Sequence, residues 1–123
     1  MSKSTQELSQ VVVDALEDVK GQEIVRIDVT ELSDVMDTLV IVTGTSNRHV
    51  KSLADNVIEE AKKLDLRPIG VEGMESGEWV LVDYGDVVLH AMLPQTRSFY
   101  DLEKLWSMEP ANRHESDEQE PQD

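Results

Sequence analysis

Apolar residues near the N-terminus recur every three or four positions, which is the spacing that places them on one face of a helix. Ser4 and Glu7 form a capping box at the start of this pattern, and Gly21 follows its last apolar position. The pattern therefore predicts a helix over roughly residues 5–20. Its apolar face would consist of Leu8, Val11, Val12, Ala15, Leu16 and Val19.

Two further helical patterns follow. Ser46 is suited to cap a second helix that extends to about Leu64, with an apolar stripe made of Val50, Leu53, Ala54, Val57, Ile58, Ala61 and Leu64. Ser98 and Asp101 are suited to cap a final helix near the C-terminus. The apolar positions of that helix would be Phe99, Leu102, Leu105 and Trp106.

Five shorter apolar stretches favour strands, because they are rich in β-branched residues or alternate between apolar and polar positions. The second of them is apolar on both faces, as in the centre of a sheet. Pro68 has no backbone N–H to donate, which favours a sheet edge for the third. The predicted strands are Ile24–Val29, Leu39–Thr43, Pro68–Val71, Glu78–Asp83 and Asp86–Met92.

The order of these elements is αββαβββα, which indicates a mixed α/β fold with a five-stranded sheet. A chain of 123 residues has room for one hydrophobic core. Residues 108–123 hold six carboxylates, one arginine and two prolines, with no large apolar residue after Met108. We therefore predict one folded domain over residues 1–107 and an acidic disordered tail over residues 108–123.

The charge of the chain restricts its partners. Acidic residues number 26 and basic residues 11, which gives a net charge of −15. Such a surface repels a phosphate backbone, so we expect little direct nucleic-acid binding and a basic partner instead. The chain has no cysteine and its longest apolar runs span three or four residues. These features predict a cytoplasmic protein that neither crosses a membrane nor is exported.

The segment from Trp79 to His90 predicts a tight hairpin with Tyr84 and Gly85 at its tip, because glycine tolerates the positive φ of a two-residue turn. In this register Trp79 lies opposite His90, Leu81 lies opposite Val88, and Asp83 lies beside Asp86. The other face of the hairpin would be core, made of Val80, Val82, Val87, Leu89 and Ala91.

The first face of this hairpin combines an aromatic side chain, a histidine and carboxylates with apolar groups, a mixture that suits a protein-binding surface. The candidate partner-binding residues are Trp79, Leu81, Asp83, Tyr84, Asp86 and His90. An alternative interpretation stays open at this point. Trp79 could belong to the core and the two aspartates could simply flank a turn, since both placements are common for these residue types.

Other motifs give little support for catalysis or metal binding. The residues "TGTSNRHV" at 43–50 could hold an anion at a helix N-terminus, but capping by Ser46 explains them better. His49, His90 and His114 are scattered and do not have the spacing of metal ligands, so no metal site is predicted. The chain also contains no Gly-x-Ser-x-Gly elbow that would mark a nucleophile. We therefore predict neither a cofactor nor enzymatic activity.

Four blocks, "TGTSNRHV", "GVEG", "EWVLVDYGDVVLH" and "RSFYDLEKLW", occur in an order and spacing that resemble the signature of the ribosomal silencing factor family, also called Iojap-like. The resemblance spans roughly residues 4–107. It implies a nucleotidyltransferase-like fold without transferase activity. It also implies binding to the large ribosomal subunit through large-subunit ribosomal protein fourteen, which would keep the small subunit from joining and lower translation when nutrients are scarce. Organellar relatives are also tied to assembly of the large subunit.

Two other functions stay open for this sequence. A metal-dependent nucleotidyltransferase would need close carboxylates, and Asp83 and Asp86 are the only pair at the ends of strands. The Gly44-Thr45-Ser46 segment imitates the nucleotide-binding motif of such enzymes only loosely. The chain could also be an adaptor for another basic protein. Formation of a homodimer in the absence of the ribosome, with Trp79 in the contact, is a further open alternative.

Overall fold

The computed structural model describes residues 5–107 of the chain. Ser4 and the segment 108–123, on which the predictions of a capping box and of an acidic tail depend, lie outside these residues. The elements are α1 (Thr5–Asp18), β1 (Gln22–Asp28), β2 (Thr38–Thr43), α2 (Asn47–Lys62), β3 (Gly70–Glu72), β4 (Trp79–Asp83), β5 (Val87–Met92), α3 (Pro94–Tyr100) and α4 (Leu102–Ser107). They confirm the predicted mixed α/β fold, apart from the division of the last helix into two.

The five strands form one sheet in the order β1-β2-β5-β4-β3. Only the β2–β5 pair is parallel among these four pairings, and its two strands are connected through α2, β3 and β4. β5 is thus the last strand in the chain but the central strand of the sheet, and all six of its residues are buried. The third strand lies at an edge, as predicted.

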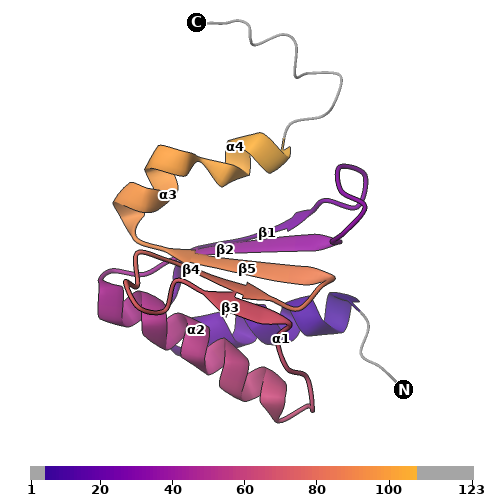
Figure 1. The fold of residues 1–123 in the computed structure, drawn as a ribbon, viewed down its shortest axis with the longest axis horizontal. Helices are drawn as coiled ribbons and strands as arrows, with labels where there is room; N and C mark the ends of the chain where they lie inside the picture. Colours follow the sequence, from indigo (N-terminus) through magenta and orange to yellow (C-terminus); the bar gives the residue numbers. More distant parts are fainter. Residues whose placement is uncertain (1–4, 108–123) are drawn as a thin grey trace, which may run out of the picture.

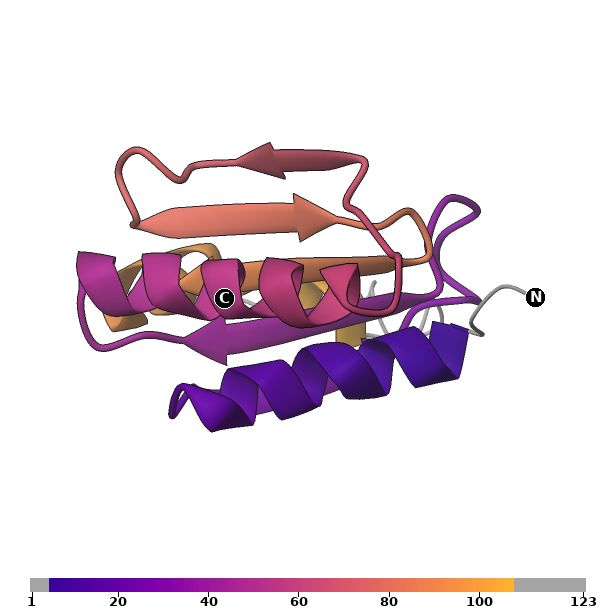
Figure 2. The same ribbon diagram turned by 90° about the horizontal axis from the view of Figure 1, so that it is seen from below.

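Helices cover the sheet on both faces (Figure 1). α1 and α2 lie side by side across one face, and Figure 2 shows them in front of the strands. Their apolar stripes pack on alternate residues of the sheet, among them Val40, Val42, Val82 and Leu89, to form what we call the helix-side core. Ser46 begins α2 as predicted, because its Oγ accepts a hydrogen bond from the His49 N–H at 3.1 Å.

The opposite face of the sheet carries a smaller core, which is partly covered by α3 and α4 (Figure 1). We call it the outer face. Its fully buried or nearly buried residues are Val29, Leu39, Ile41, Val88 and Met92. Around them pack the half-buried side chains of Ile27, Met36, Trp79, Leu81, Leu102 and Trp106.

The final helical segment differs from its prediction. It begins at Pro94, whose fixed φ and missing N–H suit a first helical turn, so Ser98 lies inside α3 and does not cap it. The helix ends at Asp101, which adopts a left-handed conformation with φ of 50°, and α4 begins directly afterwards. Asp101 therefore terminates one helix and does not cap the start of a single long one.

Arg97 fixes α3 and α4 against the sheet. Its guanidinium is buried and donates one hydrogen bond to Thr43 Oγ1 at 2.8 Å, at the end of β2. It donates two more to the Glu103 carboxylate, both at 2.8 Å. This bidentate ion pair joins the two short helices across the break at Asp101.

The β4–β5 hairpin forms as predicted, but its register is shifted by two residues. Trp79 pairs with Met92, Leu81 with His90, and Asp83 with Val88. The Tyr84 N–H donates to the Val87 carbonyl at 2.9 Å, so the two turn residues are Gly85 and Asp86. Gly85 takes the positive φ of 89° that this turn requires. A shift of two residues leaves each strand residue on its predicted face, because side chains alternate with a period of two.

Candidate partner-binding face

β4 presents three of the predicted site residues on the outer face of the sheet. Its burial alternates along the strand: Trp79, Leu81 and Asp83 are half-buried, whereas Val80 and Val82 are fully buried in the helix-side core. Asp83 also holds the turn, because its Oδ1 accepts the Gly85 N–H at 2.7 Å. The structure therefore brings together an aromatic, an aliphatic and an acidic side chain along one strand.

Trp79 is both packed and accessible, a placement that fits either interpretation of this residue. Its indole packs against the core of the outer face and stays partly exposed. Its Nε1–H donates a hydrogen bond to His90 Nδ1 at 2.9 Å. The Tyr100 ring lies on it with centroids 4.6 Å apart.

Tyr100 and Phe99 extend the aromatic surface beyond the sheet. Their rings meet edge to face with centroids 4.9 Å apart, and 52% of Tyr100 and 79% of Phe99 is exposed. Tyr100 was not among the predicted site residues, and Phe99 was predicted only as an apolar position of the last helix. The signal that could have located them is Pro94, since a helix that begins there carries residue 100 back over Trp79.

Beside Trp79 the outer face is hollowed into a shallow depression of about 250 Å³, lined by Glu72, Gly73, Trp79 and Leu81. Glu72 belongs to the edge strand β3 and pairs with Leu81, so a carboxylate stands next to an apolar side chain. Gly73 has a φ of 88°, and a Cβ on it would lie 2.0 Å from the Trp79 carbonyl oxygen. Only glycine lets the chain pass this closely behind the depression.

His90 lies on β5 behind Leu81 and Trp79 and is only 9% exposed. Burial lowers the pKa of its imidazole from 6.5 to about 4, because the charged form loses its hydration. The ring is therefore neutral at pH 7. Since Nδ1 accepts the indole N–H of Trp79, the remaining ring proton resides on Nε2.

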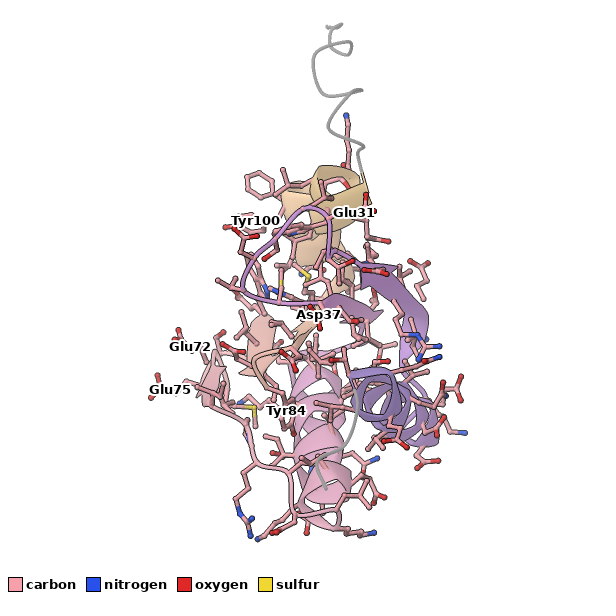
Figure 3. The ribbon with its side chains drawn as sticks, turned by 90° about the vertical axis from the view of Figure 1, so that its right-hand side faces the viewer. Glu31, Asp37, Glu72, Glu75, Tyr84 and Tyr100 are labelled. Carbon is pink, nitrogen blue, oxygen red and sulfur yellow. The ribbon has the colours of Figure 1, made fainter. Side chains whose placement is uncertain are left out.

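Tyr84 does not belong to this surface, contrary to the prediction. Its side chain packs against the helix-side core, and Figure 3 shows Tyr84 and Tyr100 on opposite sides of the sheet. The Tyr84 hydroxyl is buried and has no hydrogen-bond partner among the described residues. Burial raises its pKa to about 12. Side chains alternate between the two faces along a strand, so Tyr84, two residues after Val82, points to the same face as Val82.

Asp86 also differs from its prediction. It occupies the turn and is exposed, whereas Asp83 pairs with Val88, so the two aspartates are not paired across the hairpin. Asp86 Oδ2 accepts a hydrogen bond from Thr5 Oγ1 at 3.4 Å, and the same hydroxyl donates to Asp37 Oδ2 at 3.2 Å. Asp86 thus lies at the turn end of the hairpin, close to the start of α1. Within residues 5–107, no three His, Asp or Glu side chains are grouped closely enough to hold a metal ion.

A family model described as "Ribosomal silencing factor during starvation" matches residues 2–123. The chain belongs to this family. Proteins named ribosomal silencing factor RsfS from Chromobacterium violaceum and Haemophilus influenzae are 48% and 40% identical to it. The first alignment covers 82% of this chain and 83% of that relative, and the second covers 81% and 98%. A mouse protein named "Mitochondrial assembly of ribosomal large subunit protein 1" is 35% identical over 80% of this chain and 44% of its own length.

Solved structures agree with this family assignment. A crystal structure of a Chromobacterium violaceum protein superposes with a TM-score of 0.84 at 46% identity, covering 88% of this chain and 91% of that one. A Bacillus halodurans crystal structure gives a TM-score of 0.75 at 36% identity, covering 82% and 94%. Members of the silencing factor family are named for an effect on the ribosome, and the bacterial relatives carry no enzyme name. None of the helices in residues 5–107 has the length and apolar character needed to span a bilayer.

Proposed function

We propose that this protein represses translation in the cytoplasm by binding the large ribosomal subunit and sterically blocking attachment of the small subunit. Membership of the silencing factor family carries the proposal. The mouse relative supports the large subunit as the partner, since it is named for assembly of that subunit. The resemblance to the Iojap-like family implies that the direct contact is large-subunit ribosomal protein fourteen. It also implies that the protein represses translation when nutrients are scarce.

The outer face around Trp79 supplies a surface of suitable chemistry for that contact. An aromatic anchor, Trp79 with Tyr100, lies beside a depression that Glu72 and Leu81 also line, and the Asp83 carboxylate follows at the other end of β4. Such an arrangement suits a basic protein better than RNA, because the whole chain carries a net charge of −15. A compact domain of this length has a radius of gyration of about 13 Å, which is enough bulk to separate two subunits without any catalytic step.

Sucrose-gradient sedimentation of purified subunits tests the proposal. With excess protein, we expect fewer full ribosomes and co-migration of the protein with free large subunits. Trp79→Ala should weaken this association by roughly thirtyfold, since truncation of a buried aromatic anchor typically costs about 2 kcal/mol. Leu64→Ala is the matched control, because Leu64 is an exposed apolar residue that follows α2 on the other side of the sheet.

Thermal unfolding of both variants must accompany the binding measurement, because Trp79 also contributes to packing of the outer face. If the wild-type protein neither sediments with large subunits nor lowers the yield of full ribosomes, the proposed function is wrong. A folded Trp79→Ala protein that binds like the wild type would place the contact elsewhere on the molecule.

A further inference from the structure

The Trp79 side chain is held from two sides by residues of two other elements. On one side its indole N–H donates to His90 Nδ1 of β5 at 2.9 Å, with the ring planes tilted by 46°. On the other side the Tyr100 ring of α3 packs on it. The hydrogen bond is directional, so it selects one rotation of the indole more specifically than packing and the ring contact do.

His90 is a costly residue at this position if packing is its only role. β5 has the sequence Val-Val-Leu-His-Ala-Met, and His90 is its single polar side chain. It is a neighbour of Leu81 on β4 and of Ile41 on β2, so an aliphatic residue here would extend the apolar core of the outer face. Burial of an imidazole costs free energy unless a hydrogen bond offsets it. The bond from Trp79 is that compensation.

We propose that His90 is a positioning residue for the partner-binding face, where its Nδ1 lone pair holds the Trp79 indole in the orientation that the partner meets. The inference rests on the proposed function for the identity of the partner. A side chain ordered in advance loses less conformational entropy on binding, which strengthens the complex. Because the burial described above keeps the ring neutral, this lone pair is available throughout the physiological pH range.

The same geometry determines what Trp79 can offer to a partner. Its only hydrogen-bond donor is already used within the molecule, so the exposed part of the indole presents an apolar edge and a π face. The partner residue that contacts Trp79 is therefore apolar or cationic. A basic protein provides both kinds of side chain, and an Arg or Lys over the ring would also be near Glu72 on the rim of the depression.

Two substitutions at His90 distinguish a role as hydrogen-bond acceptor from a role in packing alone. His90→Phe fills the site with a ring but cannot accept the indole N–H, whereas His90→Gln retains an acceptor. In ¹H–¹⁵N spectra, where Trp106→Phe identifies the second indole signal, His90→Phe should shift the Trp79 Nε1–H resonance and speed its exchange with solvent. His90→Gln should leave it much closer to the wild type. This measurement needs no ribosome, so it stands even if the proposed partner is wrong.

Binding to purified large subunits provides the second measurement. Loss of one intramolecular hydrogen bond should weaken the association of His90→Phe by about three- to tenfold, with a smaller effect for His90→Gln. In a Trp79→Phe background, which has no indole N–H, the His90→Phe substitution should change affinity by less than about twofold. Equal losses in the phenylalanine and glutamine variants, or an undiminished effect in the Trp79→Phe background, would overturn the positioning role.

Discussion

At the scale of single residues, His90 couples the stability of the fold to pH. Its pKa is about 4 in the folded protein and near 6.5 in an unfolded chain. Between these values the unfolded chain binds more protons, so the contribution of His90 to folding stability is fully present above about pH 6.5 and is lost as the pH falls toward 4. This direction is the one expected for a histidine that is buried in its neutral form.

Urea unfolding at pH 7 and at pH 5 measures this linkage. The wild-type protein should lose about 2 kcal/mol more of its unfolding free energy between these values than His90→Gln does. The Glu103 carboxyl, whose pKa is lowered by hydrogen bonds from Arg97, also loses stabilisation in acid, but it does so equally in both proteins. Parallel loss of stability in the two proteins would contradict the assignment of a low pKa to His90.

The sequence correctly predicted the face of the sheet on which a side chain lies where the alternation of side chains along a strand determines it. Trp79, Leu81 and Asp83 were placed on one face by alternation alone, and the structure agrees. Tyr84 was grouped with them because it is close in sequence, but its parity directs it to the other side of the sheet. Tyr100 was missed because its contact with Trp79 depends on the path of α3, which strand periodicity does not specify.

At the scale of elements, the buried guanidinium of Arg97 carries the docking of α3 and α4. No local pattern could predict its hydrogen bond to Thr43, because the two residues are 54 positions apart in the sequence. The missed start of the helix at Pro94 has a different cause. Capping residues such as Ser98 are common signals, but a proline with a fixed φ at the first turn can start a helix without a side-chain cap.

Arg97→Met tests the contribution of this ion pair, since methionine keeps much of the apolar length without the guanidinium. The variant leaves Thr43 Oγ1 and the Glu103 carboxylate without these hydrogen bonds, so its unfolding free energy should fall by about 2 kcal/mol. Arg67→Met is the control, because Arg67 pairs with Asp65 at an exposed position. That substitution should change stability by less than about 0.5 kcal/mol. Similar effects in both variants would show that the buried pair contributes no more than an exposed one.

At the scale of the whole molecule, net charge should control how fast the protein finds a basic partner. A charge of −15 attracts a basic surface over distances that salt shortens. We expect the association rate with large subunits to fall severalfold between low and physiological salt. Glu72→Gln, on the rim of the partner-binding face, should reduce that dependence on salt more than Glu60→Gln, which removes a charge from α2 on the opposite side.

Stopped-flow mixing at several salt concentrations checks this expectation. Rates that do not vary with salt would mean that charge plays no part in recognition. If the association rates of the two variants depend on salt to the same extent, the rim of the depression has no special role in recognition.

The sequence predicted the charge and the mixed sheet, but not the order of the strands. The position of β5 between β2 and β4 is set by the packing of both cores together.

The central position of β5 has a consequence for synthesis of the chain. Before β5 is made, the polypeptide can form only the β1–β2 and β3–β4 pairs, which are marginal as isolated hairpins. Both cores also lack residues that β5 contributes, such as Leu89 on one side and Val88 on the other. The sheet therefore closes only after its last strand has been translated, and contacts between residues far apart in sequence make that closure slow. A nascent chain that stops short of β5 therefore cannot present a finished Trp79 surface.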